Sequence, residues 1–391
     1  MSTPTERRAP RAPGGKALGK GIRNETGPGW LFVSPMVVVL GVFLFVPVIM
    51  AAWVSVSDWN GRGSPFASGM QFVGAQHYAE MLSGRGLAAR DFGTAIRNNV
   101  YYVIFVVPLQ TALALGLAFM VNSRALRGKG FFRTAFYFPS VTSSVAITVL
   151  WLFLFSASGA VNAFLALFSV NGPNWFQDSR GIIHLLLGGG EAPASMAQPG
   201  LLGISSWEWI AGPSIAMCAF IVMAVFTTSG TFMLLFLAAL QSIGEETDEA
   251  AMVDGASAWQ RFWYVTLPML RPTMFTVITL GLIGTWQVFD QIYTGSQGGP
   301  SKTTLTPAYL SYQTAFESQR WGRGAAIAFI LFAIIVLMTL LQRLILGDSD
   351  PTKPTRRELR AERRAQQRTV QEPAPAVTTV PASTSSGGSD G

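Results

Sequence analysis

Charged residues are scarce in this chain of 391 residues, at 13% of the total, whereas 50% of the residues are hydrophobic. A soluble domain carries about 25% charged residues. Together with a mean hydropathy of +0.36, this composition places the chain among membrane proteins. Cysteine occurs once, at Cys218, which excludes an internal disulfide and a site with several cysteine ligands. A small apolar residue inside a hydrophobic run is a sufficient explanation for it.

Patterns typical of catalysis and nucleotide binding are also missing from the sequence. The two histidines, His77 and His184, lie far apart and outside the hydrophobic runs, so we expect neither a metal site nor a catalytic pair. No glycine-rich phosphate loop, metal-ligand cluster or nucleophile with its base occurs in the sequence. We therefore predict a protein that is not an enzyme, holds no cofactor or metal and binds no nucleic acid.

Long uncharged runs are what the chain does have, and six of them can cross a membrane. A bilayer core needs about 20 apolar residues of helix. The first run is too long for a signal-peptide core and lacks a clear cleavage site, so we expect it to be retained. The predicted fold is an all-α integral membrane protein with six transmembrane helices, at about residues 30–57, 98–123, 132–156, 209–240, 272–294 and 324–346.

The six predicted spans form one domain, residues 28–347, between two polar tails. Residues 1–27 are rich in Pro, Gly and Arg and cannot bury enough apolar surface to offset the entropy of ordering. Residues 348–391 carry six arginines between positions 356 and 368 and continue rich in Pro, Ala, Thr and Ser. We expect both tails to be disordered. Contact of the basic tail with anionic lipid and simple solvation are both open.

The distribution of Lys and Arg predicts the orientation of the chain. With successive loops placed on alternate sides of the membrane, one side carries 6 Lys and Arg residues in the N-terminal tail, 4 between spans two and three, 2 between spans four and five and 8 after Gln342. That side therefore has 20 Lys and Arg residues, and the other side has 8. Because the cytoplasmic side carries the excess of positive charge, both termini and the loop around Glu249 are predicted to be cytoplasmic.

The polar stretch at residues 249–272 carries the signals of two short helices joined by an elbow. Acidic residues open the first helix, where they favour its positive dipole end. Gly255 then ends it, because glycine takes the left-handed conformation at low cost. A capping box from Ser257 to Gln260 starts the second helix, and Pro268 and Pro272 close it. On this punctuation alone, an ordinary helix–elbow–helix loop is the favoured interpretation.

This stretch resembles the EAA loop of ABC importer permeases, EAA-x3-G-x9-I-x-LP, with Val265 in place of Ile. A departure lies at residues 244–247, where the family commonly has a Pro and an aromatic residue; it leaves the entry angle of the first helix open. In that family the loop, here residues 245–271, is cytoplasmic and docks on the ATPase subunit. The resemblance therefore implies a coupling role for Glu249, Ala250, Ala251, Asp254, Gly255, Leu267 and Pro268.

Three further segments are similar to the carbohydrate branch of that family, the maltose-type permeases. They are residues 72–78, which fit an FVG-x-x-x-Y pattern ahead of Asn98 and Asn99 at the start of the second span, the Gly-Gly-Pro at 298–300, and residues 312–316. The resemblance implies a bacterial cytoplasmic membrane protein that pairs with a second permease as a heterodimer. It also implies an ATPase dimer that binds the ATP, an extracytoplasmic solute-binding protein and a carbohydrate substrate.

Polar residues at membrane depth mark the candidate solute path, because they are costly there unless they face a cavity or another helix. In the fourth run Thr228, Ser229 and Gly230 lie near the bilayer midplane. This group suits either a helix break that lines a pathway or a close crossing of two helices.

The end of the fifth run is the second candidate for the path. Gln287, Asp290 and Gln291 recur at i, i+3 and i+4, so on one helix they share a face, which Trp286 and Tyr293 flank. Carboxylate, amide and aromatic side chains suit a sugar. An interfacial belt of aromatic residues is the alternative interpretation.

The permease subunit of an ABC sugar importer is therefore the leading hypothesis. A secondary, ion-coupled transporter is the main alternative, although coupling to ions normally needs several ionisable residues deep in the spans and only Asp290 qualifies here. An integral membrane enzyme is a third, weaker hypothesis.

Overall fold

The computed structural model describes residues 26–66, 70–123, 125–188, 193, 195–198 and 200–346. By its internal contacts the chain divides into two units, residues 1–342 and 343–391. Of the second unit the structure describes residues 343–346, which are helical, and all other described residues belong to the first unit. The two predicted tails lie outside the described residues, apart from residues 26 and 27, which begin the first helix.

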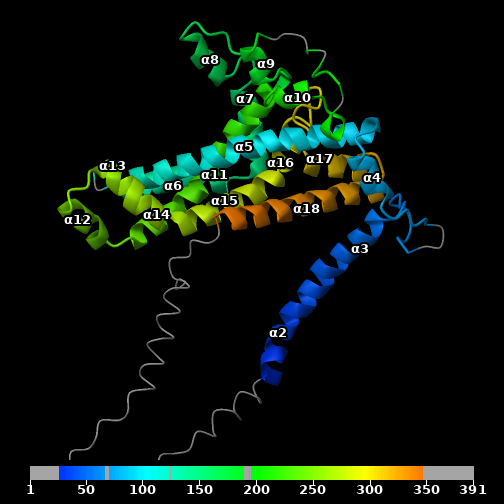
Figure 1. Ribbon diagram of the computed structural model, residues 1–391, viewed down its shortest axis with the longest axis horizontal. Helices are drawn as coiled ribbons and strands as arrows, with labels where there is room; N and C mark the ends of the chain where they lie inside the picture. Colours follow the sequence, from blue (N-terminus) through cyan, green and yellow to red (C-terminus); the bar gives the residue numbers. More distant parts are fainter. Residues whose placement is uncertain are drawn as a thin grey trace, which may run out of the picture. The chain divides into compact units, whose positions relative to one another are not determined.

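Every named element in the described ranges is helical, in agreement with the predicted class (Figure 1). Two isolated β-bridges, Ser57 with Phe72 and Gly181 with Ser214, join loop segments. The helices in chain order are α2 (Thr26–Leu40), η1 (Gly41–Phe45), α3 (Val46–Ser55), α4 (Gln76–Leu82), α5 (Gly86–Asn122), α6 (Lys129–Val141), α7 (Ser144–Leu154), α8 (Ala160–Ala166), η2 (Trp175–Gln177), α9 (Ile182–Leu186), η3 (Leu201–Gly203), α10 (Ser206–Ile210), α11 (Ile215–Ser242), α12 (Glu245–Val253), α13 (Ala258–Arg261), η4 (Phe262–Thr266), α14 (Leu267–Met269), α15 (Arg271–Trp286), α16 (Asp290–Gly295), α17 (Pro307–Tyr312), η5 (Gln313–Glu317) and α18 (Trp321–Leu346).

Four helices of the described chain are long and apolar enough to cross a membrane: Gly29–Ser55, Gly86–Asn122, Ile215–Ser242 and Trp321–Ile345. Two bent pairs raise the number to six if each pair counts as one span. They are Lys129–Val141 with Ser144–Leu154, bent by 98°, and Ala258–Met269 with Arg271–Trp286, bent by 66°. The six predicted spans thus correspond to four long helices at the first, second, fourth and sixth positions and to bent helix pairs at the third and fifth.

The third predicted span, residues 132–156, is broken because its middle is poor in helix-forming residues. α6 ends two residues after Pro139, and Thr142 and Ser143 have extended backbones before α7 starts. Serine and threonine side chains compete for backbone hydrogen bonds and favour helix ends over helix interiors. The two helices accordingly pack on different neighbours: α6 packs on α11 and α7 packs on α16.

The fifth predicted span, residues 272–294, is also two helices. α15 ends at Trp286, Gln287 to Phe289 leave the helical conformation, and α16 starts at Asp290. The Val288 carbonyl accepts a hydrogen bond from Thr306 Oγ1 at 3.1 Å instead of one from a later turn of helix. An acidic residue such as Asp290 is favoured in a first helical turn. The prediction that Gln287, Asp290 and Gln291 share one continuous helical face is therefore wrong.

The second helix is longer than predicted, because α5 starts at Gly86 and not at Asn98. Its first three turns carry charged residues on one side and pack against α4 and η3 on the other. Asn98 and Asn99 thus lie inside the helix, at 3% and 0% exposure, and do not open it.

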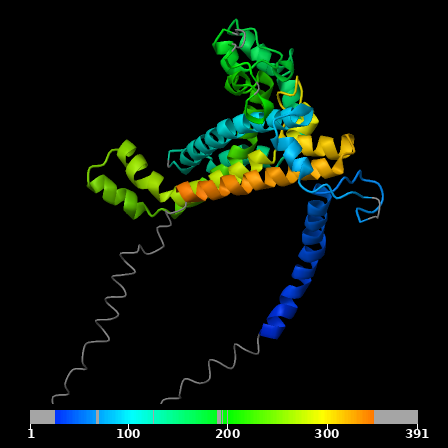
Figure 2. The same cartoon turned by 45° about the vertical axis from the view of Figure 1, so that its right-hand side comes forward.

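α5, α11 and α15 pack together as the core of the first unit (Figures 1 and 2). α6 crosses α11 where Gly230 has no side chain; a Cβ there would overlap the Phe136 carbonyl. α18 lies along α15, since Gln342 Nε2 donates to the Phe275 carbonyl at 3.1 Å and to Thr279 Oγ1 at 3.0 Å. The hairpin of α12 and α13 follows the Ser242 end of α11, whereas α10 precedes the Ile215 end.

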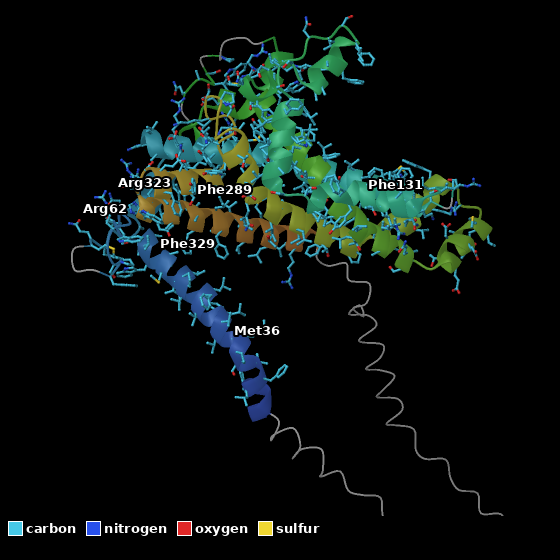
Figure 3. All side chains as sticks on the ribbon, turned by 180° about the vertical axis from the view of Figure 1, so that it is seen from behind. Met36, Arg62, Phe131, Phe289, Arg323 and Phe329 are labelled. Carbon is cyan, nitrogen blue, oxygen red and sulfur yellow. The ribbon has the colours of Figure 1, made fainter. Side chains whose placement is uncertain are left out.

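Large apolar side chains cover the outer faces of several helices. Met36 of α2 is 65% exposed and Phe131 of α6 is 73% exposed (Figure 3). Within the 18-residue window of the first span only 6% of the residues are buried. Such surfaces are expected where a helix meets lipid or another membrane-spanning chain.

Candidate functional site

A cavity of about 240 Å³ lies where α5, α11, α15 and α16 meet. A second cavity of about 280 Å³, on the α6 side, shares Ser144, Thr228, Phe232 and Gln291 with it. We call the two together the path cavities. Thr228 lies 14 residues before the end of the 28-residue helix α11, about 21 Å at 1.5 Å per residue, so the cavities lie at the middle of that helix. Their polar lining consists of Tyr102, Gln110, Ser140, Thr142, Ser144, Thr227, Thr228, Thr231, Thr285, Gln287, Asp290 and Gln291.

Gln110 is the most enclosed polar residue of the lining, at 1% exposure. Its Oε1 lies 2.6 Å from Thr228 Oγ1, which also lies 2.7 Å from the Ala224 carbonyl. Its Nε2 finds no acceptor among the described residues. Gly281 faces this amide, and a Cβ there would overlap Nε2. Within the described chain, Gln110 thus places an unpaired amide nitrogen in the wall of the cavity, packed against Gly281.

The group at residues 227–231 forms a close helix crossing and not a helix break, since α11 is continuous from Ile215 to Ser242. Ser140 Oγ of α6 donates to the Thr227 carbonyl at 2.5 Å and accepts from Thr231 N at 3.2 Å. Of the three predicted path residues here, Thr228 lines both cavities. Ser229 is buried at 3% exposure and bonds to its own helix, and Gly230 lies under α6.

The break between α15 and α16 brings Gln287, Asp290 and Gln291 to the same cavity, although not as one helical face. Tyr102 of α5 donates to Gln291 Oε1 at 3.2 Å across the cavity. A non-helical segment at this depth exposes backbone polar groups, and such groups are tolerated in membranes only where they line a cavity or are buried in protein.

Trp286 and Tyr293, the other predicted path residues, do not line either path cavity. Trp286 is 4% exposed and packs in the core. Tyr293 stacks on Phe289 with ring centroids 5.4 Å apart and meets Tyr312 edge-on at 5.3 Å. Phe289 itself lines the cavity and supplies an aromatic face to it.

The sequence prediction missed Gln110, Tyr102 and Thr285, which the structure places in the lining. For Gln110 a signal was present, since it is an amide in the middle of an uncharged, apolar run. Tyr102 and Thr285 carry no comparable signal, because both residue types are common in helices that pack against one another.

The predicted elbow is present at residues 249–272. Gly255 has φ +78°, and Gly255 N and Ala256 N donate to the carbonyls of Met252 and Ala251, both at 3.0 Å. These two backbone hydrogen bonds form the pattern of a Schellman cap. Ser257 and Gln260 form the predicted capping box. The helix ends here are therefore set by local sequence.

The hairpin of α12 and α13 is braced on its inner side and exposed on its outer side. Arg261 donates to the Asp248 carboxylate at 2.6 Å, and Phe262 packs on Phe119 of α5 with ring centroids 5.2 Å apart. Val253 is 88% exposed and Trp259 70%. Among the predicted coupling residues, Glu249, Ala250, Asp254 and Gly255 are exposed, and Ala251, Leu267 and Pro268 are half-buried.

The polar groups of the path cavities are suited to hydrogen bonding with a solute. They are mainly amides and hydroxyls, set among apolar side chains, with Asp290 as the one carboxylate of the lining. In the described part of the chain, no group of three or more His, Cys, Asp or Glu residues is placed to hold a metal ion. Amide, hydroxyl and carboxylate groups beside an aromatic face suit a neutral polyhydroxylated solute.

Known proteins with similar sequence and fold are membrane components of transporters. The chain is 30% identical over 318 residues to the lactose transport system permease protein LacF of Rhizobium radiobacter, covering 80% of this chain and 92% of LacF. It is 28% identical over 317 residues to the trehalose/maltose transport system permease protein MalF of Thermococcus litoralis, covering 81% and 92%. A solved bacterial ABC transporter that imports the acidic polysaccharide alginate has the same fold, with a TM-score of 0.61 at 19% identity over 85% of this chain and 99% of that one.

A family match covers more than half of the sequence and includes all of the path cavities except Tyr102 and Val106. Residues 110–346 match the description "binding-protein-dependent transport system inner membrane component". Together with the similarity to LacF over most of both chains, this match shows that the chain belongs to the family of binding-protein-dependent transport system inner membrane components.

Proposed function

We propose that this chain is the permease subunit of an ABC importer and forms half of the pathway for a sugar or a sugar-like solute. The observation that carries this proposal is the polar lining of the path cavities at the middle of an otherwise apolar helix bundle, in a chain of this family. Polar groups at that depth are costly and are retained where they serve a solute.

A second, related permease would form the other half of the pathway. The two path cavities of this chain, which share four lining residues, have volumes of about 240 and 280 Å³, and together they reach the range of about 300–1,000 Å³ of small-molecule sites. The exposed apolar faces of α2 and α6 offer surface for that chain and for lipid.

The energy would come from ATP bound by a separate ATPase dimer, which we propose docks on α12. The hairpin supports this role because its outer side is exposed and its angle is fixed by the glycine cap and the Asp248–Arg261 pair. Movement of α12 would pass through α13 and α14 into α15, whose end lies at the path cavities.

The solute would be delivered by an extracytoplasmic binding protein to the opposite face of the bacterial cytoplasmic membrane. The excess of Lys and Arg, 20 against 8, favours cytoplasmic termini and a cytoplasmic α12 hairpin. Names of relatives support a carbohydrate, since LacF and MalF are permeases of lactose and trehalose/maltose systems.

Reconstitution tests this function against ion-coupled transport. The complex of this chain with its second permease and ATPase, in vesicles with the binding protein outside, should take up solute with ATP and Mg²⁺ inside and no ion gradient. A proton or sodium gradient alone should drive no uptake. Uptake that follows the gradient and ignores ATP would show that the chain is a secondary transporter.

A further inference from the structure

A large polar cavity of about 590 Å³ lies at the Ser214 end of α11, at the opposite end of that helix from the α12 hairpin. It shares no residue with the path cavities. Three segments that are distant in sequence meet there: the first turns of α5, residues 179–214, and residues 301–303 of the loop between α16 and α17. We call it the outer cavity.

Positive side chains outnumber negative ones around the outer cavity. Its lining has four cations, Arg90, Arg97, Arg180 and Lys302, and two carboxylates, Asp91 and Glu208. The side chains of Arg90, Arg180 and Lys302 are 64%, 63% and 53% exposed. Each of these three exposed cations has one carboxylate partner, Glu208, Asp178 or Asp91, so with Arg97 the site holds four cations and three carboxylates and a small excess of positive charge.

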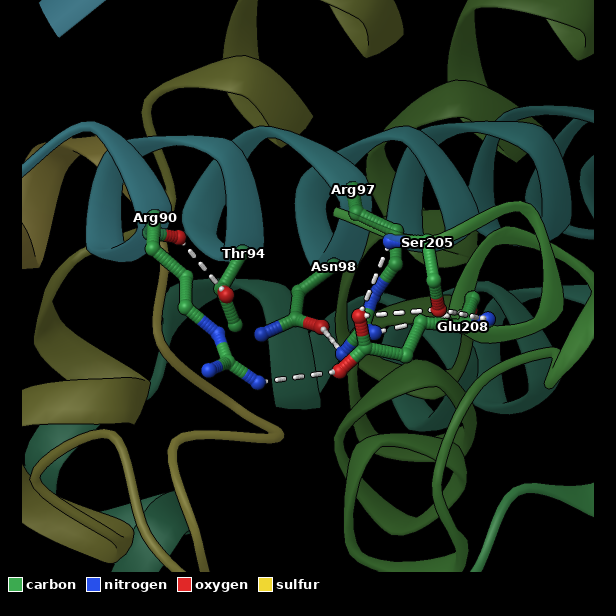
Figure 4. A network of polar contacts seen from close by, with 6 residues as sticks. All are labelled: Arg90, Thr94, Arg97, Asn98, Ser205 and Glu208. Atoms are coloured by element: carbon green, nitrogen blue, oxygen red, sulfur yellow. Dashed lines mark hydrogen bonds and ion pairs between the residues drawn. The ribbon is translucent and has the colours of Figure 1, made fainter. Parts of the chain in front are cut away.

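The internal partners of these cations leave them able to accept another anion. Arg90 lies 3.5 Å from Glu208, whose carboxylate also accepts from Ser205 N and Oγ (Figure 4). Arg97 donates to Asn98 Oδ1 at 3.1 Å and to the Glu208 carbonyl at 3.4 Å, both uncharged acceptors (Figure 4 shows the first of these bonds from Arg97 on α5).

Arg180 and Lys302 each hold one carboxylate at the rim. Arg180 donates to Asp178, and these bonds keep the pKa of Asp178 below its ordinary value. Lys302 Nζ lies 2.6 Å from Asp91 Oδ1. Because exposed pairs of this kind contribute only about 0–1 kcal/mol, an incoming carboxylate can replace Asp91 on Lys302 at little cost.

The loop that carries Lys302 connects the outer cavity to the path cavities. Asn98 Nδ2 donates to the carbonyls of Lys302 and Leu305, at 2.8 and 3.0 Å. Thr306, at the end of the same loop, donates to the carbonyl of Val288, in the break that lines the path. A partner that displaces Lys302 would therefore act on the segment between α15 and α16.

We propose that the outer cavity is the docking site for carboxylate side chains of the solute-binding protein, and that their exchange with Asp91 on Lys302 signals arrival of that protein to the path. This inference rests on the proposed function. A binding protein fits the cavity better than a free anion does, because it brings a carboxylate at high local concentration to cations that already have internal partners. Complementary charge at such a rim mainly raises the rate of encounter.

Carbodiimide cross-linking tests the exchange directly, because it joins a lysine amine to a carboxylate in contact with it. Lys302 suits the experiment, since the chain has only five lysines, at positions 16, 20, 129, 302 and 353. The reconstituted complex alone should give the internal Lys302–Asp91 link. Adding loaded binding protein should reduce that link and produce one between Lys302 and an aspartate or glutamate of the binding protein, identified by mass spectrometry. The internal link alone under both conditions would overturn the proposal, as would a link to an acidic solute.

Charge variants give an independent readout. Reversal of two rim cations, Arg90→Glu with Lys302→Glu, should raise the binding-protein concentration for half-maximal stimulation of ATP hydrolysis at least tenfold and reduce its dependence on salt. Lys302→Arg keeps the charge and should keep the stimulation while losing the cross-link. Arg62 is an exposed arginine outside the cavity (Figure 3). Arg62→Glu is therefore the matched control and should change neither the half-maximal concentration of binding protein nor its dependence on salt.

The two proposals fail in different ways. If the wild-type complex shows no ATP-driven uptake, the proposed function is wrong. If it transports and the reversed variant responds to binding protein like the wild type, the outer cavity is not the docking site and the proposed function stands.

Discussion

Gln110 shows most clearly how a single residue marks the path. It lies in the middle of α5, is 1% exposed and keeps an amide nitrogen without an acceptor in the described chain. A buried donor that lacks a partner costs about 1–3 kcal/mol. We infer that this glutamine, opposite Gly281 and beside Thr228, turns its amide toward a solute when one enters the cavity.

Substitution of Gln110 should therefore separate stability from transport. Gln110→Met keeps the volume and removes the unpaired donor, so we expect unchanged or higher thermal stability of the purified complex. Loss of one hydrogen bond to the solute, about 1.5 kcal/mol, should lower the rate of uptake at subsaturating solute about tenfold. Thermal unfolding and uptake of labelled solute measure the two effects.

Gln342→Met is the matched control for that substitution. Gln342 is also buried, at 6% exposure, but its amide donates to Phe275 and Thr279 and lies outside the path cavities. The control should lower stability by about 1 kcal/mol and leave uptake nearly unchanged. Equal rates of uptake by the Gln110→Met and Gln342→Met variants would show that Gln110 does not bind the solute.

At the scale of helices, the sequence determines ends better than breaks. The Gly255 cap, the Ser257 capping box and four long spans were predictable because each depends on local residues or on a long apolar run. The breaks after Val141 and Trp286 were not predicted: Pro139, Thr142 and Ser143 weaken the first helix only locally, and a contact distant in sequence, Thr306 with Val288, holds the second break. Consequently the candidate site was found in part: Thr228, Gln287 and Asp290 line it, whereas Trp286 and Tyr293 do not.

The α12 hairpin supports a prediction at this scale. Gly255 has φ +78° and open space around it, so only backbone conformation opposes a side chain there. Gly255→Val should cost roughly 1–2 kcal/mol in the left-handed region, shift α12 and abolish stimulation of ATP hydrolysis by loaded binding protein. Gly255→Asn is the control, since asparagine tolerates this conformation, and it should keep most of the stimulation. If the valine variant is stimulated normally, the angle at Gly255 does not matter for coupling.

At the scale of the whole molecule, a six-span topology requires the two ends of α11 to face opposite sides of the membrane. In a Cys218→Ser background the chain has no other cysteine, so single cysteines can report their side. Gln177 and Ala258 are exposed and lie beyond opposite ends of α11. An impermeant thiol reagent outside intact cells should label Gln177→Cys and leave Ala258→Cys unlabelled until the membrane is opened. Labelling of both from outside would contradict the six-span topology.

The central claim is that the path cavities carry the solute, and a cysteine at Thr228 tests it most directly. In the reconstituted complex without native cysteine, Thr228→Cys should react with a small thiol reagent, and saturating solute with binding protein should slow that reaction at least tenfold. Arg62→Cys, at an exposed position outside both path cavities, should react at the same rate with and without solute. Protection of position 228 alone is the predicted result. Equal reaction of Thr228→Cys with and without solute, in a complex that still transports, would contradict a role of these cavities in carrying the solute.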